Sequence, residues 1–502
     1  MRKRLFMLGA MAISMHNVTS QISSTEFEHK SQWSRNLGFG TKNAAYMHNA
    51  YTSDYRELYA GYEQTMYNKA VIMEEGEGER KWGLKAASYS SFKEKSKIWG
   101  EAGYQSRKRK KVLWNSTADF RLLYPYVLAD TVGGDLDCER YYFSGGCATR
   151  LGKFSIGERI RFRADHEYRE TDPRPRSVVT DLVLEAGGRH EQEHYNFGIN
   201  GGILIYKQTN DVSFYQELGK TPELQMSGLG ADYKRFSGSN AASYYKSVGY
   251  NIGVQFQPND STSGTYISAS YTDRPFQRIL TSLNSLPISR LYLMEYNAEL
   301  GWREETGKVS WQIGGRWQRE KRQGDEIVAG SPSSDEYRKL DELTMFHSQN
   351  DEYALCGAIH HSGLHTYTVK MSGGLQKYSS DYVFPERKVT FDKAFGKIDS
   401  QWQHSYQQLA IQTDVKASYF SNLKDGISYP LALVSPTNKG YLEHMYESAS
   451  ANYLLLGLDV RIGFPVGKSD NIRMFATIGA EHMSTNTNNK GITISSKIGL
   501  NF

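Results

Sequence analysis

The stretch of sequence that decides the fold is Lys490-Gly-Ile-Thr-Ile-Ser-Ser-Lys-Ile-Gly-Leu-Asn-Phe502. Apolar and polar residues alternate along it, with the period of two that is typical of an extended strand with two unlike faces. One face carries Ile492, Ile494, Ile498, Leu500 and Phe502, interrupted by Ser496, and the other carries Thr493, Ser495, Lys497, Gly499 and Asn501. Soluble sheets contain such strands too, so the fold depends on whether the pattern recurs.

The same alternation recurs through the chain in segments of 10–15 residues, which is longer than the five or six residues typical of globular sheets. Tyr and Trp lie at the apolar ends of several of these segments, where they suit a membrane–water interface. This combination favours strands that cross a membrane. The clearest segments are 194–206, 290–303, 308–320, 367–376, 409–419 and 454–464.

The connections between the predicted strands alternate strictly between short and long, as periplasmic turns and extracellular loops do in outer-membrane barrels. The short turns are 92–97, 151–153, 190–193, 259–262, 304–307, 362–364, 403–404 and 466–470. The long loops are 66–77, 109–136, 171–175, 209–239, 275–287, 324–343, 380–385, 422–441 and 485–489. We therefore predict an all-β fold, a transmembrane antiparallel β-barrel of about 18 strands, with about 16 as the alternative count.

One segment does not fit a wall strand. Trp114–Ala129 contains the strand-like run Ala118-Asp-Phe-Arg-Leu-Leu-Tyr124. A wall strand here would break the short–long order on both sides, so we expect a structured extracellular loop.

The composition agrees with a barrel. The mean hydropathy is -0.60 and no segment after residue 20 has 18 consecutive apolar residues, but a barrel needs apolar residues only at alternate positions. The formal charge is +5, and Arg2, Lys3 and Arg4 supply three of these charges. The remainder gives no reason to expect nucleic-acid binding.

Three parts are predicted along the chain. Residues 1–21 combine a basic start with a short apolar run, which is typical of a cleaved signal peptide. Residues 22–53 lack alternation and form a periplasmic lead or a plug in the lumen, and residues 54–502 form the barrel. The last strand is expected to close the barrel against Asp54–Thr65.

Four pieces of sequence carry a resemblance: Tyr126-Val-Leu-Ala-Asp-Thr-Val-Gly-Gly-Asp135, Tyr141-Tyr-Phe-Ser-Gly-Gly146, Leu151-Gly-Lys-Phe-Ser-Ile-Gly157, and Asp172-Pro-Arg-Pro175 with Asp181-Leu182. They resemble an uncharacterised, porin-like family of outer-membrane β-barrels of Bacteroidota. The resemblance implies a Gram-negative outer membrane and assigns no residue a role.

Charged residues on the predicted lumen face are the main site candidates. Arg159, Arg161 and Arg163 alternate on one strand, and we expect the others on neighbouring strands. They form either a constriction that selects ions or acidic solutes, or an ion-pair network that fills the lumen, which we favour because wide barrels need a polar interior. The full set is Arg159, Arg161, Arg163, Glu295, Glu299, Arg303, Arg316 and Glu320.

His360, His361 and His365 bracket a predicted turn and are the weak candidates for a metal site. No Cys or acidic cluster supports them, so we predict no metal and no cofactor. The sequence also lacks a phosphate-binding glycine loop, a nucleophile elbow and a Cys-x-x-Cys pair, so we do not predict an enzyme. The three cysteines, Cys138, Cys147 and Cys356, are expected to be small, buried or lipid-facing free thiols that form no disulfide.

Two charged runs lie near loops. Glu74-Glu-Gly-Glu-Gly-Glu79 lacks the spacing of a calcium loop, and we expect a solvated acidic loop. Arg107-Lys-Arg-Lys-Lys111 suits the phosphates of lipopolysaccharide, with an ordinary charged loop as the alternative.

The leading functional hypothesis is a passive channel or uptake barrel for an unidentified solute. The alternatives are a surface adhesin or an accessory of another outer-membrane protein and, more remotely, a barrel lipase or protease. The expected partners are outer-membrane lipids, lipopolysaccharide, and the barrel-assembly machinery, which would recognise the terminal Phe502.

Overall fold

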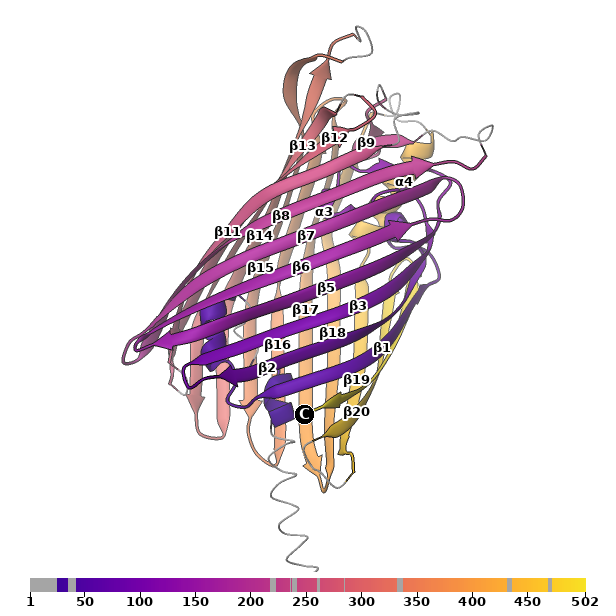
Figure 1. The fold of residues 1–502 in the computed structure, drawn as a ribbon. Coiled ribbons are helices and arrows are strands. Elements are labelled where there is room, and N and C mark those ends of the chain that lie inside the picture. The colour runs from indigo at the N-terminus through magenta and orange to yellow at the C-terminus, as the bar shows by residue number, and fades with distance from the viewer. Residues whose placement is uncertain are drawn as a thin grey trace, which may run out of the picture.

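The wall of the molecule is one antiparallel sheet of 18 strands that closes on itself. The computed structural model describes residues 25–34, 42–216, 223–234, 236, 242–259, 262–283, 285–331, 337–430, 436–467 and 472–502. Figure 1 shows long, tilted strands that follow one another around the barrel. The wall strands are β1 (Tyr55–Tyr67), β2 (Gly78–Phe92), β3 (Ser96–Val112), β5 (Gly134–Leu151), β6 (Phe154–Tyr168), β7 (Arg174–Glu191), β8 (Tyr195–Ser213), β11 (Ser243–Pro258), β12 (Gly264–Leu280), β13 (Leu286–Thr306), β14 (Val309–Ala329), β15 (Lys339–His361), β16 (His365–Tyr382), β17 (Arg387–Tyr406), β18 (Leu409–Ser428), β19 (Tyr453–Pro465), β20 (Arg473–Thr485) and β21 (Lys490–Asn501).

The carboxy-terminal strand closes the barrel, as the sequence predicts. β21 pairs antiparallel with β1, and Ile498 lies opposite Ala60. Phe502 extends the pairing, because its backbone N–H donates to the carbonyl of Arg56 at 3.0 Å and its carbonyl accepts from the Arg56 N–H. Both the predicted strand count and the predicted closing pair are confirmed.

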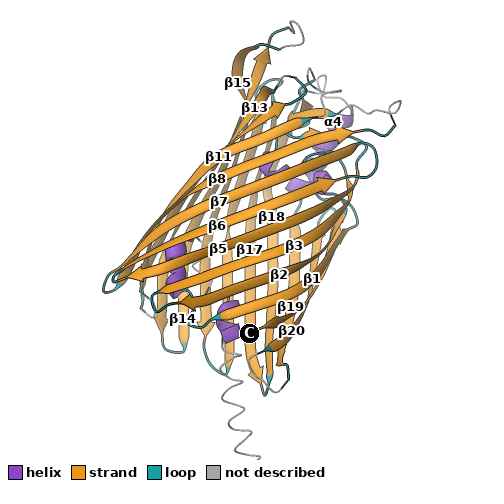
Figure 2. Ribbon diagram, viewed as in Figure 1, coloured by secondary structure: helices purple, strands orange, loops and turns teal. Residues whose placement is uncertain are grey.

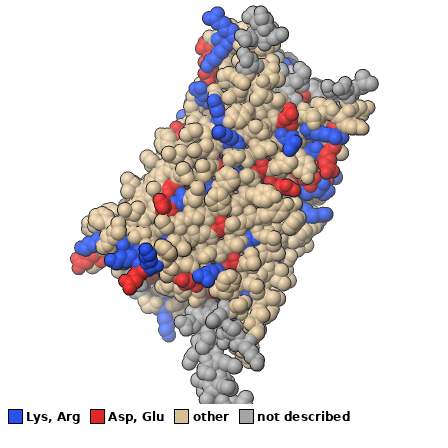
Figure 3. Space-filling view, in the orientation of Figure 1, with Lys and Arg blue, Asp and Glu red and all other residues tan. Residues whose placement is uncertain are grey.

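The outer face of the wall is an apolar belt. Ile313 is 59% exposed and Leu355 is 75% exposed. Contact of such large apolar side chains with water is unfavourable, whereas contact with lipid is favourable. Aromatic rings meet side by side on this face, as in the pairs Trp82–Tyr104 at 5.5 Å and Tyr271–Tyr296 at 4.9 Å. In Figure 3 the charged residues gather mainly toward the two ends, with an extensive uncharged surface between them. The wall is therefore a transmembrane β-barrel.

Three further short strands lie outside the wall and form their own small sheet. β4 (Leu128–Ala129) pairs with β9 (Leu224–Gly228), which pairs with β10 (Ala231–Asp232). The helix α3 (Phe120–Leu123) precedes β4, and the longer helix α4 (Pro436–Ser450) lies between β18 and β19. The prediction that 114–129 forms a structured loop is confirmed.

Several predicted connections differ from the structure. The loops expected at 275–287 and 324–343 are shorter, because β12 continues to Leu280 and β14 to Ala329, while β13 begins at Leu286 and β15 at Lys339. The turn expected at 403–404 lies at 407–408, because the hairpin continues to the pair Tyr406–Leu409 and Gln407 adopts the positive φ of 51° that the turn requires. The loop expected at 422–441 begins only after Ser428, where β18 ends, and α4 extends beyond it to Ser450. The polar sequence of α4 lacks a strong helical periodicity.

Figure 2 shows short helices near both ends of the barrel. Those near the lower end belong to the amino-terminal segment, which includes the 3₁₀ helix η1 (Ala44–Asn49). The predicted signal segment 1–21 lies outside the described residues. Among the residues that the structure describes, no helix is long and apolar enough to cross a membrane.

Candidate functional site

The amino-terminal segment, residues 25–34 and 42–53, binds the inner face of the wall near the short turns. Glu26 pairs with Arg461 of β19 at 2.7 Å, and both side chains are almost fully buried. Lys30 pairs with Glu57 of β1, also at 2.7 Å, and burial lowers the pKa of Lys30. These contacts tie the start of the segment to the seam where the barrel closes.

Two aromatic side chains anchor the segment on the opposite part of the wall. The ring of Trp33, 4% exposed, stacks on His360 of β15 with 5.4 Å between the ring centres. The guanidinium of Arg303 on β13 lies 4.6 Å from the ring centre of Trp33. Tyr46 of η1 is equally buried, and Arg189 of β7 lies over its ring at 5.2 Å.

The wall leaves room for the segment at three glycines. A Cβ built on Gly157 would collide with the backbone of Ala44 and Ala45, and a Cβ on Gly198 would lie 2.6 Å from the Tyr46 ring. A Cβ on Gly187 would collide with the side-chain oxygen of Asn43. The recesses on β6, β7 and β8 therefore match the shape of this segment.

At the other end, parts of three long loops fold together over the lumen. We call residues 113–133, 223–234 and 436–450 the loop cap. They share a buried apolar cluster with the ends of the neighbouring wall strands, so hydrophobic packing holds the cap on the wall. Members of this cluster include Trp114, Leu123, Tyr126, Val127, Met226 and Tyr441 from the cap and Tyr206, Tyr245, Phe276 and Leu291 from the wall.

The cap also buries charged groups. Arg169 and Asp130 form an ion pair of 2.9 Å in which neither side chain is exposed. Glu223 is fully buried near Asp130, and burial, with this like charge, raises the pKa of Glu223 to about 8. Glu74 accepts a hydrogen bond from the Tyr441 hydroxyl, and burial raises the pKa of Glu74 to about 7.

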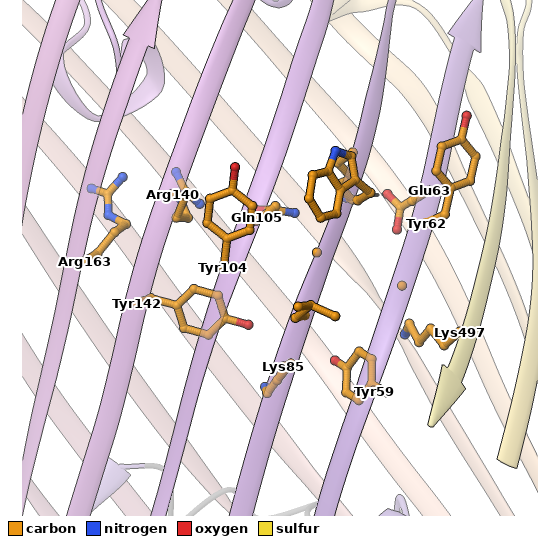
Figure 4. Close-up of a pocket in the computed structure, with 15 residues that line it drawn as sticks. Tyr59, Tyr62, Glu63, Lys85, Tyr104, Gln105, Arg140, Tyr142, Arg163 and Lys497 are labelled. Carbon is orange, nitrogen blue, oxygen red and sulfur yellow. Dashed lines mark ion pairs between the residues drawn. The ribbon is translucent and has the colours of Figure 1, made fainter. Parts of the chain in front are cut away.

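A cavity of about 430 Å³ lies in the wall near the seam of the barrel. Figure 4 shows its lining on neighbouring strands, with Arg163 at one side, Lys497 at the other, and Tyr142, Lys85 and Tyr59 between them. Gly61 of β1 lies opposite Gly83 of β2, so no side chain fills the floor there. The ring of Tyr142 covers Gly103, whose Cβ would lie 2.5 Å from the ring.

Arg163 joins this cavity to the cap. Its guanidinium binds Asp119, which lies just before α3, through two parallel hydrogen bonds of 2.9 and 2.6 Å. It also reaches Asp165 at 2.7 Å and Asp181 at 3.3 Å. Burial raises the pKa of Asp119, but the hydrogen bonds and charge of Arg163 outweigh this and hold that pKa below its usual value.

The other predicted lumen residues form separate pairs. Arg159 and Arg161 both bind Glu185 of β7, at 2.7 and 3.2 Å. Arg316 binds Glu352 at 2.7 Å, and Glu299 lies 3.6 Å from Lys42 of the amino-terminal segment.

The prediction that these charged residues lie on neighbouring strands was wrong. β7, β8, β11 and β12 separate the arginines of β6 from Arg303 on β13 and Arg316 on β14. Glu295 lies opposite Glu320 on β13 and β14, and Glu320 binds Arg322 at 2.8 Å. The predicted turns and loops already place four strands between Arg163 and Arg303, so the shared polar face alone did not make these residues neighbours.

The histidines do not come together. His360 stacks on Trp33 and contacts Thr368 at 2.9 Å, while His365 stacks on His404 at 4.1 Å. His361 contacts the carbonyl of His365 at 3.3 Å. Within the described residues there is no group of three His, Cys, Asp or Glu side chains that is placed to hold a metal ion.

The two charged runs bind each other and their neighbours. The solvated acidic loop was a wrong expectation, because Glu74 is only 4% exposed and Glu75 binds Arg121 at 2.5 Å. The basic run lies on β3, where Arg109 binds Glu167 at 2.6 Å on the inner face. The remaining basic residues, Arg107, Lys108, Lys110 and Lys111, are also paired, with Glu79 and Glu167, Asp137, Asp135 and Glu77.

The predicted free thiols are confirmed for Cys138, Cys147 and Cys356. The sequence interpretation missed Asp119, which lies in a strand-like run, and the cavity residues Tyr59, Lys85 and Tyr142. Their positions on the polar faces of β1, β2 and β5 are readable from alternation. The opposed glycines that open the cavity depend on strand register, which the sequence does not state.

The chain belongs to a family whose model matches residues 44–502 and is described as "Family of unknown function (DUF6850)". No curated protein matches it in sequence.

Solved structures of outer-membrane barrels are similar to this one at low identity. The siderophore receptor PiuA from Acinetobacter baumannii has a TM-score of 0.41 at 7% identity, over 89% of this chain and 82% of that one. The outer membrane transporter YddB from Escherichia coli has a TM-score of 0.41 at 10% identity, over 89% and 81% of the two chains.

Proposed function

We propose that this protein is an outer-membrane uptake barrel for a small solute, and that the amino-terminal segment is a plug that moves to open the periplasmic end. The observation that carries this proposal is the fit of a single continuous segment into recesses around the inside of the wall. Its contacts reach β1, β7, β13, β15 and β19.

The chemistry of these contacts supports a plug that leaves as a unit. The charged groups of these contacts become hydrated when the segment departs, and the wall strands keep their own hydrogen-bond ladder. A passive, permanently open channel is less well supported, because the segment and the loop cap cover opposite ends of the lumen.

Conductance in planar bilayers tests the proposal. We expect a variant lacking residues 25–53 to conduct more than the full chain, since only the loop cap would then cover the lumen. A variant as silent as the full chain would contradict the gate and favour the accessory role.

A clamp provides the matched control. Asn43 and Gly187 face each other closely enough that the double change Asn43→Cys with Gly187→Cys should form a disulfide across the interface. With this disulfide formed, the barrel should stay closed under conditions that open the wild type, and reduction of the disulfide should restore opening. The single change Asn43→Cys should respond to neither treatment.

A further inference from the structure

The charges of the arginines and carboxylates around Arg163 balance only when one carboxylate from the cap is included. Arg140 and Arg274 bind Asp165 and Asp181, at 2.8 and 2.6 Å, and Arg163 reaches both carboxylates. All of these residues lie on wall strands. The third carboxylate of the group, Asp119, comes from the cap.

Asp119 occupies its position in the manner of a bound ligand. Arg163 grips both oxygens of its carboxylate, which is the bidentate geometry that an arginine offers to any planar carboxylate. The hydroxyl of Tyr206 donates a further hydrogen bond to it at 3.1 Å. Asp119 has a left-handed backbone, with φ of 52° and ψ of 39°, and its side chain makes no cap hydrogen bond to α3.

The arginine that binds this carboxylate also lines the cavity, so space for a larger molecule lies beside Arg163. Arg163 and Arg140 both line the 430 Å³ cavity, together with the rings of Tyr59 and Tyr142. Lys85 lies in the same lining, and the ammonium of Lys497 lies 6.0 Å from the ring centre of Tyr59. A carboxylate on Arg163 would thus have Arg140 and the ring of Tyr142, both on the adjacent strand β5, within reach of the rest of its molecule.

We infer that the cavity is the binding site of a small organic anion, whose carboxylate replaces that of Asp119 on Arg163. The body of the solute lies against Tyr142, with Arg140 beside it on the same strand. Asp119 is then an internal competitor that releases Arg163 when the solute arrives, and this loosens the cap at α3. This inference rests on the proposed uptake function and names its substrate class.

The alternative occupant is a phosphate group, since arginine binds both anions. The two terminal nitrogens of Arg163 already bind the planar carboxylate of Asp119, and the Tyr206 hydroxyl donates to the same carboxylate. The site is therefore assigned to carboxylates, and phosphate becomes an arm of the test.

Calorimetric titration of the full chain in detergent tests the assignment without requiring transport, so its failure is distinct from failure of the plug. Citrate and inorganic phosphate are the probes, with glucose as the neutral reference. Asp119→Asn keeps the shape of the side chain and removes its charge. It should bind citrate about tenfold more tightly than the wild type, because the competing carboxylate is gone.

Two further variants keep the test decisive. Asp119→Gly suits the left-handed backbone and should give the same tightening if the Asn variant fails to fold. Arg163→Lys, combined with Asp119→Asn, should return citrate binding to the wild-type level, because lysine cannot form the fork. Asp172→Asn, which changes a loop carboxylate bound to Arg174 at 2.7 Å, is the control and should leave citrate binding unchanged.

Citrate affinities that agree within about twofold between the wild type and both Asp119 variants would overturn the inference, as would tightening for phosphate alone. Tightening for citrate that Arg163→Lys abolishes would support it.

Discussion

The amino-terminal segment and the loop cap both cover the lumen, but they are built differently. The segment is one continuous stretch, held to the wall by ion pairs, cation–π contacts and glycine recesses. The cap is assembled from three loops far apart in the sequence, around an apolar cluster that it shares with the wall. Withdrawing the segment breaks contacts with one stretch of chain, whereas opening the cap exposes a hydrophobic core. The proposed uptake function therefore has the segment move before the cap.

Breaking the buried ion pair of the segment should have the largest effect on its docking. Glu26→Ala removes one of the two carboxylates on Arg461, which keeps Glu57 at 3.0 Å, and should weaken docking of the segment by ~2–3 kcal/mol. Protease cleavage at Lys30 as a function of urea measures the release. Glu28→Ala is the control, because the Glu28 carboxylate binds the exposed Thr52 within the segment. Equal shifts for the two variants would refute the anchoring role of Glu26.

A change in the wall should disturb both regions together. Ile313→Arg places a charge on the lipid face and should cost ~2–4 kcal/mol of barrel stability, whereas Gln318→Arg on the lumen face should cost much less. Folding into lipid vesicles at graded urea gives both values. If Ile313→Arg released the segment while the cap stayed protected, the wall would not be the common support of the two regions.

A change in one recess should affect the segment alone. Gly187→Val fills the space of the Asn43 side chain and should weaken docking by ~1–3 kcal/mol through overpacking. Gly188→Val is the matched control, because a Cβ there meets nothing within 4 Å. Cleavage at Lys30 should rise for the first variant and not for the second. The reverse order would mean that the recess does not position the segment.

A rise in pH from 5 to 8 should weaken the cap. Burial raises the folded-state pKa of Glu74 to about 7 and that of Glu223 to about 8, from the ordinary glutamate value of 4.5. Between the unfolded and folded values the folded cap holds a proton that the unfolded chain has lost, so stability falls as pH rises, by roughly 1.4 kcal/mol per unit for each group. Hydrogen exchange at the Met226 amide, which donates to Val127, should therefore quicken from pH 5 to pH 8. After correction for the intrinsic rate, Glu74→Gln should reduce this change, and a cap with equal protection at both pH values would contradict it.

The two regions also differ in how far the sequence predicts them. Alternation places Ile498 on the lipid face and Lys497 in the lumen, and the short–long order of connections gives the count of 18 strands, because both are local properties. The contact of Asn43 with the wall near Gly187, and that of Asp119 with Arg163, depend on how strands far apart in sequence are arranged around the barrel. The acidic run at Glu74 illustrates the same limit, since its burial comes from Tyr441, more than three hundred residues further along the chain.

The most direct test of the central claim compares two buried serines, one in each region. Ser31 in the segment is 6% exposed and Ser227 in the cap is 2% exposed. Ser31→Cys and Ser227→Cys are made separately in a chain whose three native cysteines are replaced by serine, and maleimide labelling is followed as urea is raised. The thiol at position 31 should react at urea concentrations where position 227 and the barrel remain protected. Simultaneous labelling at both positions, or earlier labelling at 227, would contradict the claim that the segment is released while the cap remains folded.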